Sequence, residues 1–188
     1  MKQLLLFIFL TVMSFQSLLF GQCITQNLHN KSYQFCLNSK NWYEAQNDCA
    51  SKNMSLLSNI TFAKHYFIMS EIQNMLIPES FWIGLNDFEA ENIWVWSNGT
   101  ELLQSDETFW EENQPDNSNE EDCVEMRSEF NYKWNDNNCL TLNYYICEGE
   151  LITDNDRDGF PAEVDCDDTN SLINPDAVEM CNGIDDNC

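Results

Sequence analysis

Oxygen-bearing side chains and two cysteines gather in residues 114–139. The stretch holds a Gln-Pro-Asp triplet at 114–116, a Glu-Asp-Cys triplet at 121–123 and a Trp-Asn-Asp triplet at 134–136. Carboxylate and carboxamide oxygens are the ligands of hard divalent cations such as Ca²⁺. If Cys123 and Cys139 form a disulfide, these oxygens lie together on a tethered loop. The spacing favours a divalent-cation site, and the alternative is a solvated loop rich in Asn and Asp.

A second set of acidic residues has the spacing of a calcium-binding loop. Residues at loop positions 1, 3, 5, 6 and 12 are Asp154, Asp156, Asp158, Gly159 and Asp165. In loops of the EF-hand type, position 7 adds its backbone carbonyl, which here belongs to Phe160. No helical pattern precedes Asp154, so the sequence predicts a calcium loop without an EF-hand domain. The alternative is a disordered acidic linker.

Two helices are expected early in the chain. In the first, capped by Asn41 or Ser39, one face carries Trp42, Ala45 and Cys49. The second, after Ser58 or Asn59, has these residues at helical spacing: Phe62, Tyr66, Met69 and Ile72. We expect both faces to point into a core.

After Pro78 the pattern changes to short apolar runs separated by polar turns, which predicts strands. The expected strands cover residues 81–85, 93–96, 123–126 and 144–147. Helices followed by short antiparallel strands indicate an α+β fold. Residues 98–121 carry no regular pattern, and a loop of that length in a compact domain is usually functional.

The chain divides into three segments by composition. Residues 1–22 are typical of a secretory signal peptide, and the alternative is an uncleaved membrane anchor. Residues 23–150 have enough apolar side chains for one core. Residues 151–188 carry 11 acids against one base and few large apolar residues, whereas residues 23–150 carry 21 acids against six bases. The acidic tail is therefore a separate unit that needs metal or disulfides to fold.

The nine cysteines indicate an oxidising compartment, so we expect a secreted, extracellular or cell-surface protein. Because their number is odd and Cys188 ends the sequence, we expect the chain to stop within a domain.

The net charge of −24 argues against binding to nucleic acid or to an anionic membrane, since both require Lys and Arg.

Residues 23–148 resemble a C-type lectin-like domain in the order of their motifs. These are Trp82-Ile83-Gly84-Leu85, Trp94-Val95-Trp96-Ser97, Gln114-Pro115-Asp116, Trp134-Asn135-Asp136 and six cysteines. The resemblance implies the long form of the domain, with disulfides Cys23–Cys36, Cys49–Cys147 and Cys123–Cys139. The residues alone leave the connectivity open.

The same resemblance implies a calcium ion that also binds sugar. Its ligands would be Gln114, Asp116, Glu121, Asn135 and Asp136, with a cis peptide before Pro115. Two vicinal hydroxyls of the sugar would complete the calcium sphere. Gln114 and Asn135 would contribute their NH₂ groups to these hydroxyls, and Asp116 and Glu121 their carboxylate oxygens. An auxiliary calcium in some family members would use Asp87, Glu91 and Asn117, sharing Glu121.

The Gln-Pro-Asp triplet goes with galactose-type ligands in this family. Residues 117–120 lack the aromatic or glycine residues common in galactose binders, and Phe130 or Tyr132 is the candidate replacement. Weak binding of each sugar would make an oligomer useful in recognition or adhesion.

The tail resembles MopE-type Asp/Cys-rich metal-binding repeats, which implies further repeats downstream.

Two other functions compete with a lectin. An enzyme is disfavoured, because the only histidines, His29 and His65, are isolated and no hydrolase motif occurs. A lectin-like domain that binds a protein or ice is the stronger alternative, since a fold does not specify the ligand.

Overall fold

The structure is a computed structural model that describes residues 22–188 except 119, 152, 163 and 181. The predicted signal peptide, residues 1–22, lies outside the described residues apart from Gln22. The chain divides into two compact units, Met1–Gly149 and Glu150–Cys188. Within the described part of the chain, no helix is long and apolar enough to cross a membrane.

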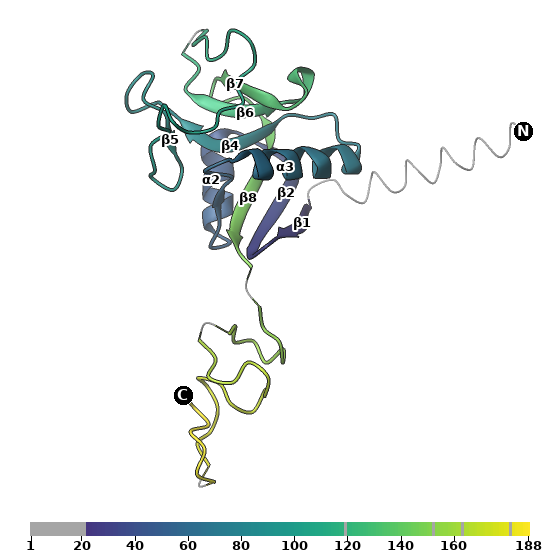
Figure 1. The fold of residues 1–188 in the computed structure, drawn as a ribbon, viewed down its shortest axis with the longest axis vertical. Helices are drawn as coiled ribbons and strands as arrows, with labels where there is room; N and C mark the ends of the chain where they lie inside the picture. Colours follow the sequence, from purple (N-terminus) through teal and green to yellow (C-terminus); the bar gives the residue numbers. More distant parts are fainter. Residues whose placement is uncertain (1–21, 119, 152, 163, 181) are drawn as a thin grey trace, which may run out of the picture. The chain divides into compact units, whose positions relative to one another are not determined.

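One mixed sheet forms the framework of the first unit (Figure 1). Its strands are β1 (Cys23–Leu28), β2 (Lys31–Lys40), β3 (Ser55–Leu56), β4 (Phe81–Asn86), β5 (Val95–Trp96), β6 (Cys123–Arg127), β7 (Lys133–Asn137) and β8 (Asn143–Glu150). The order is β1-β2-β8-β4-β6-β7, with β3 on β8 and β5 on β4. With the helices α2 (Trp42–Ala50) and α3 (Phe62–Met75) and the 3₁₀ turn η1 (Ser128–Phe130), this confirms the predicted α+β fold.

Four strands were not predicted from the sequence: β1, β2, the short β3 and β7. β1 and β2 form an antiparallel hairpin in which Cys23 pairs with Cys36. The alternation that marks β2 is present in the sequence, since Tyr33, Phe35 and Leu37 are buried. β7 contains the Trp-Asn-Asp triplet, whose two polar side chains hid its strand character.

Helix α2 follows the prediction closely. Asn41 is its N-cap, and its side chain forms a capping box with Glu44. The buried face consists of Trp42, Ala45 and Cys49. The Trp42 indole donates to the Ile83 carbonyl at 2.8 Å, which fixes α2 against β4.

The predicted inner face of α3 was right in part: Ile72 is buried and Met69 packs against the core, but Phe62 and Tyr66 are exposed. The helix begins after the N-cap Thr61, and its buried residues are His65, Ile68 and Ile72. Phe62 and Tyr66 are 52% and 64% exposed. The predicted and the observed buried residues both recur at helical spacing. The sequence therefore does not determine which of these two adjacent apolar faces packs against the sheet.

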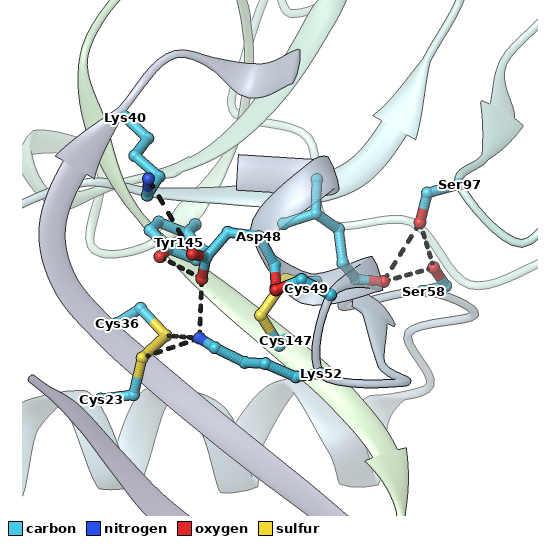
Figure 2. Close-up of a disulfide and its surroundings, with 12 residues drawn as sticks. Cys23, Cys36, Lys40, Asp48, Cys49, Lys52, Ser58, Ser97, Tyr145 and Cys147 are labelled. Atoms are coloured by element: carbon cyan, nitrogen blue, oxygen red, sulfur yellow. Dashed lines mark hydrogen bonds and ion pairs between the residues drawn. A yellow bond between two sulfur atoms is a disulfide. The ribbon is translucent and has the colours of Figure 1, made fainter. Parts of the chain in front are cut away.

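Three disulfides connect elements of the first unit. Figure 2 shows Cys49 of α2 bonded to Cys147 of β8, and Cys23 of β1 bonded to Cys36 of β2. Cys123 is bonded to Cys139, so all three pairings implied by the resemblance are present. The Cys49–Cys147 bridge spans 98 residues, and in the loop-entropy model such a closure contributes about 4–5 kcal/mol.

The second unit has a fourth disulfide, Cys166–Cys188. The ninth cysteine, Cys181, lies outside the described residues. Glu150–Cys188 contains no helix or strand among its described residues after β8. Among its described residues, the buried side chains are those of Ile173, Asp165 and Asp186, of which Ile173 is the one large apolar residue.

Candidate metal centre

Strands β6 and β7, at the edge of the sheet opposite β1, provide the rigid base of the site (Figure 1). Their register places Val124 opposite Asp136 and Glu125 opposite Asn135. Trp134 is fully buried, and its ring packs edge-on against Trp96, Phe109 and Trp110. This packing fixes β7, so the side chains of the two residues after Trp134 are held in place.

The long segment between β5 and β6 returns to β7 before it enters the Gln-Pro-Asp triplet. The Trp134 amide donates to the Phe109 carbonyl at 2.8 Å, and the Glu111 amide donates to the Trp134 carbonyl at 3.0 Å. The Gln114–Pro115 peptide is cis. Apart from isolated bridges at Glu101 and Trp110, the described residues of 98–121 form no helix or strand.

The Asp136 carboxylate anchors the loop after Pro115. It accepts hydrogen bonds from the backbone amides of Asp116 at 3.2 Å and Asn117 at 2.7 Å. The Asn117 side-chain oxygen in turn accepts from the Glu121 amide at 2.8 Å. These bonds hold the acidic loop, residues 116–121, against β7.

Three predicted ligands converge. One carboxylate oxygen from each of Asp116, Glu121 and Asp136 lies within 4.8 Å of the others. The Gln114 side-chain oxygen is buried and has no hydrogen-bond partner. A buried polar atom without a partner is costly unless an ion or water satisfies it. These oxygen ligands fit a hard divalent cation. Asn135, the fifth predicted ligand, directly precedes Asp136 in the sequence and is buried.

The electrostatics of this cluster also favour a cation. Burial raises the pKa of Asp136, although three backbone amides oppose the shift. Burial, followed by the charges of Asp136 and Asp116, raises the pKa of Glu121. Carboxylates that repel one another in a partly buried site are stabilised by a divalent ion.

The residues predicted for the auxiliary ion do not form a carboxylate cluster. Asp87 is 3% exposed, and one of its oxygens accepts from the Asn92 amide at 2.8 Å while the other is buried without a partner. Burial raises the pKa of Asp87 to about 6, with the charges of Glu91, Asp122 and Asp136 adding to it. Within the described residues, Asp87 and Glu91 belong to no group of three metal-ligating side chains. The side-chain oxygen of Asn117 already holds the Glu121 amide.

In the second unit, Asp154, Asp156 and Asp158 converge as the loop spacing predicted. Asp154 accepts hydrogen bonds from the amides of Arg157 and Gly159, so the chain wraps around its carboxylate. One oxygen of Asp156 and one of Asp165 are buried without partners. Burial and the neighbouring carboxylates raise the pKa of Asp156.

Sequence reasoning missed a buried carboxylate next to the first cluster. Glu125 is 2% exposed and accepts hydrogen bonds from the side chains of Asn135, Asn137 and Asn143. The available signal was an acid in the middle of the apolar run Cys123–Met126, because buried acids are uncommon and need partners.

Two family sequence models match parts of this chain. A sequence model described as "Lectin C-type domain" matches residues 38–149. A second model, described as a metal-binding motif and named for MopE copper binding, matches residues 165–188. The second match begins after the cluster at 154–158.

Individual proteins give the same result. The chain is 35% identical over 122 residues to hepatic lectin from Gallus gallus, which covers 64% of this chain and 56% of that protein. The chain spans about a quarter to about half of the length of the curated relatives it matches.

Two solved structures illustrate the range of the fold. The carbohydrate-recognition domain of mouse scavenger receptor C-type lectin aligns with a TM-score of 0.62 and 31% identity, covering 69% of this chain and 95% of that one. Herring type II antifreeze protein aligns with a TM-score of 0.59 and 25% identity, covering 68% and 96%.

Proposed function

Because the chain belongs to the C-type lectin family, we propose that its first unit binds carbohydrate through a calcium ion held by Gln114, Asp116, Glu121, Asn135 and Asp136. The observation that carries the proposal is the convergence of three carboxylates within 4.8 Å, supported by the buried, unpartnered side-chain oxygen of Gln114, two residues before Asp116. Lectins are binding proteins, so family membership supports binding rather than catalysis.

Calcium supplies coordination sites that two vicinal sugar hydroxyls occupy. Asp136 would hold the ion from the rigid β7 strand, and the Asp116 and Asn117 amides, which donate to its carboxylate, fix the loop at the site. Carboxylate oxygens of Asp116 and Glu121 accept hydrogen bonds from the hydroxyls, and the Gln114 amide donates. Charge-assisted bonds of this kind depend on the ion, so sugar binding is lost when calcium is removed.

The test compares one ligand variant with a matched control on the same segment. Asp116→Ala removes a carboxylate of the cluster, whereas Asp106→Ala removes an exposed carboxylate that accepts a hydrogen bond from the Leu103 amide. We expect D116A to lose retention on immobilised galactose and mannose in calcium, and D106A to keep it. Wild-type retention that persists in EDTA, or a D116A variant retained like wild type, would contradict the proposal.

For the type of sugar, we propose a galactose-like ligand from the order of amide and acid in Gln114-Pro115-Asp116. A glycan array in calcium tests it. Binding confined to mannose or fucose would refute the galactose assignment and leave calcium-dependent sugar binding in place.

For the second unit, we propose a calcium ion bound by the side chains of Asp154, Asp156, Asp158 and Asp165 and the Phe160 carbonyl. The unpartnered oxygens of Asp156 and Asp165 support a cation here. The matching motif is named for copper, but copper prefers nitrogen and sulfur ligands, whereas the ligands proposed here are oxygen atoms. A set of carboxylates and a carbonyl suits calcium.

Ice or protein binding is the second candidate, because herring type II antifreeze protein has a similar fold. Competition by free sugar distinguishes the two, since an ice or protein ligand is not displaced by it.

The disulfides support an oxidising location, so we propose a secreted or cell-surface protein that gains avidity by forming oligomers.

A further inference from the structure

Strand β1 is an open edge of the sheet. Among the described residues it ends the strand order, with β2 on one side and no strand on the other (Figure 1). Its six residues pair with β2 in an unbroken antiparallel register, without a bulge. The side chains of Thr25 and Asn27 are exposed. An edge of this kind presents unpaired backbone groups to which another strand can bond.

The hydrogen-bond pattern shows which backbone groups of β1 face outward. The Leu37 amide donates to the Gln22 carbonyl at 3.1 Å. Bonded and non-bonded pairs alternate along an antiparallel ladder, so the next pair, Cys23–Cys36, is non-bonded. Its Cα–Cα distance of 3.9 Å agrees, because non-bonded pairs are the closer ones. The N–H and C=O groups of Cys23, and of every second residue after it, Thr25 and Asn27, therefore point away from β2.

The two edges of the sheet differ in protection. At the other edge, β7 carries Lys133 and Asp136, and the chain before Gln114 covers this strand through bonds between Trp134 and residues 109 and 111. Natural sheets protect their open edges with charges, prolines or bulges. Cys23–Leu28 contains no charged residue and no proline. In a chain with a net charge of −24, β1 is thus an edge where a second copy meets no charge of its own sign.

We propose that β1 pairs antiparallel with β1 of a second copy of this chain, about a two-fold axis at Thr25. In this register Thr25 lies opposite Thr25 of the partner subunit, and Cys23 lies opposite Asn27 of the partner subunit. Each of these pairs exchanges two backbone hydrogen bonds, so the outward groups of β1 are satisfied together. The pairing is self-complementary, as a two-fold interface requires. Opposed threonines are a favourable cross-strand pair.

The dimer presents two carbohydrate sites. The strand order runs from β1 to β7, so joining two copies through β1 leaves each cluster of Asp116, Glu121 and Asp136 at an outer edge of the combined sheet. Two sites on one sheet bind a multivalent glycan surface more tightly than either site alone. This use of the dimer rests on the proposed function, whereas the contact itself needs neither calcium nor sugar.

Sedimentation equilibrium of the full chain in EDTA tests the contact without calcium. The parent carries Cys181→Ser, because a ninth cysteine can crosslink two chains. Thr25→Pro removes an outward N–H that β2 does not use, and Thr25→Lys places two like charges opposite each other. Gln104→Lys, at an exposed position outside β1, is the charge control. We expect T25P and T25K to weaken dimerisation by at least about tenfold, and Q104K to match the parent.

The outcomes of sedimentation are decisive in both directions. A parent that is monomeric at every concentration reached, or a dimer that T25P and T25K leave unchanged, overturns the proposal. Unfolding midpoints show whether T25P is folded. If proline disturbs the hairpin, T25K carries the test, because it changes only an exposed side chain.

Cysteine crosslinking tests the register. In the same parent, Thr25→Cys places two thiols at directly opposed positions, whose Cα atoms are about 5.5 Å apart and within reach of a disulfide. Asn27→Cys is the matched control on the same edge, because Asn27 and Asn27 of the partner subunit lie about 14 Å apart along the strands. We expect oxidised T25C to form a covalent dimer joined through position 25 in peptide mapping, and N27C to stay uncrosslinked. Equal crosslinking of the two variants, or none in T25C, overturns the proposal.

A calcium-dependent measurement separates the dimer from the proposed function. On a surface densely coated with galactose, in calcium, we expect the parent to dissociate at least about tenfold more slowly than T25P. If neither protein binds the sugar, that part of the proposed function fails, and the dimer is judged by sedimentation and crosslinking alone. If both dissociate at the same rate although the parent is a dimer, the two sites do not act together and the bivalent role is wrong.

Discussion

At the level of single residues, the first unit concentrates negative charge where it is least well solvated. Asp87 and Asp136 are almost fully buried, and burial raises the pKa of each. A carboxyl group with a higher pKa in the folded state than in the unfolded state binds a proton more tightly when folded. Ionisation of these groups therefore opposes folding, and either protons or calcium relieve that cost.

Acidification should stabilise the calcium-free protein and weaken its calcium binding. The pKa of Asp87 is raised from 3.8 to about 6, so its destabilising effect is complete at pH 7 and is removed as the pH falls from about 6 towards 4. Urea midpoints in EDTA should rise between pH 7 and pH 5, while the calcium dissociation constant increases over the same range. Asp87→Asn provides the control, because its urea midpoint should vary less with pH. Equal pH profiles for the two proteins would contradict the assignment to Asp87.

At the level of elements, α3 and β7 show how packing places the site. Ile68 and Ile72 of α3 are fully buried in the same core cluster as Phe81 and Ile83 of β4. Trp134 of β7 belongs to that cluster too. The residue after β4, Asp87, bonds through its backbone amide to the carbonyl of Asp122, just before β6. The core and this hydrogen bond therefore fix the positions of the strands that flank the acidic loop.

Paired substitutions on α3 test which face is buried. Ile68→Ala should destabilise the first unit by about 2–5 kcal/mol, because a fully buried aliphatic side chain is lost and a cavity remains. Tyr66→Ala should change stability by less than about 0.5 kcal/mol, since the residue is 64% exposed. Urea unfolding monitored by tryptophan fluorescence measures both. Equal losses would mean that the helix is rotated from its position in the structure.

At the level of the whole molecule, the two units are stabilised by different means. The first has two clusters of buried apolar residues and three disulfides. Among its described residues, the second has one disulfide, few buried apolar groups, and many backbone amides bonded to carboxylates, as at Asp154 and Asp186. Neighbouring carboxylates repel one another, so we expect the second unit to depend on bound calcium far more than the first.

Proteolysis at Arg157 should report this dependence. Arg157 is the single Lys or Arg of residues 150–188 and lies inside the proposed calcium loop. Trypsin should cut there at least about tenfold faster in EDTA than in calcium, because cleavage requires local opening of the loop. Mass spectrometry of the fragments gives the rate, and tryptic sites in the first unit serve as internal references.

Two variants complete this test. Asp156→Asn should abolish calcium protection, whereas Asp176→Asn, an exposed acid outside the loop, should leave it unchanged. Equal cleavage with and without calcium in the wild-type chain would rule out an ion at this loop.

Local spacing in the sequence was enough to predict the α+β class, the inner face of α2, the long irregular segment and the acidic loops. These features depend on neighbouring residues, on caps such as Asn41 and on motifs read in order. The disulfide pairing came from family resemblance, because spacing alone leaves it open. Only the tertiary structure decided that α3 buries Ile68 instead of Tyr66, and that Glu125 lies inside and holds the amide of Asn135. Both depend on contacts between segments distant in the chain, where packing and the cost of a buried charge select one partner among many.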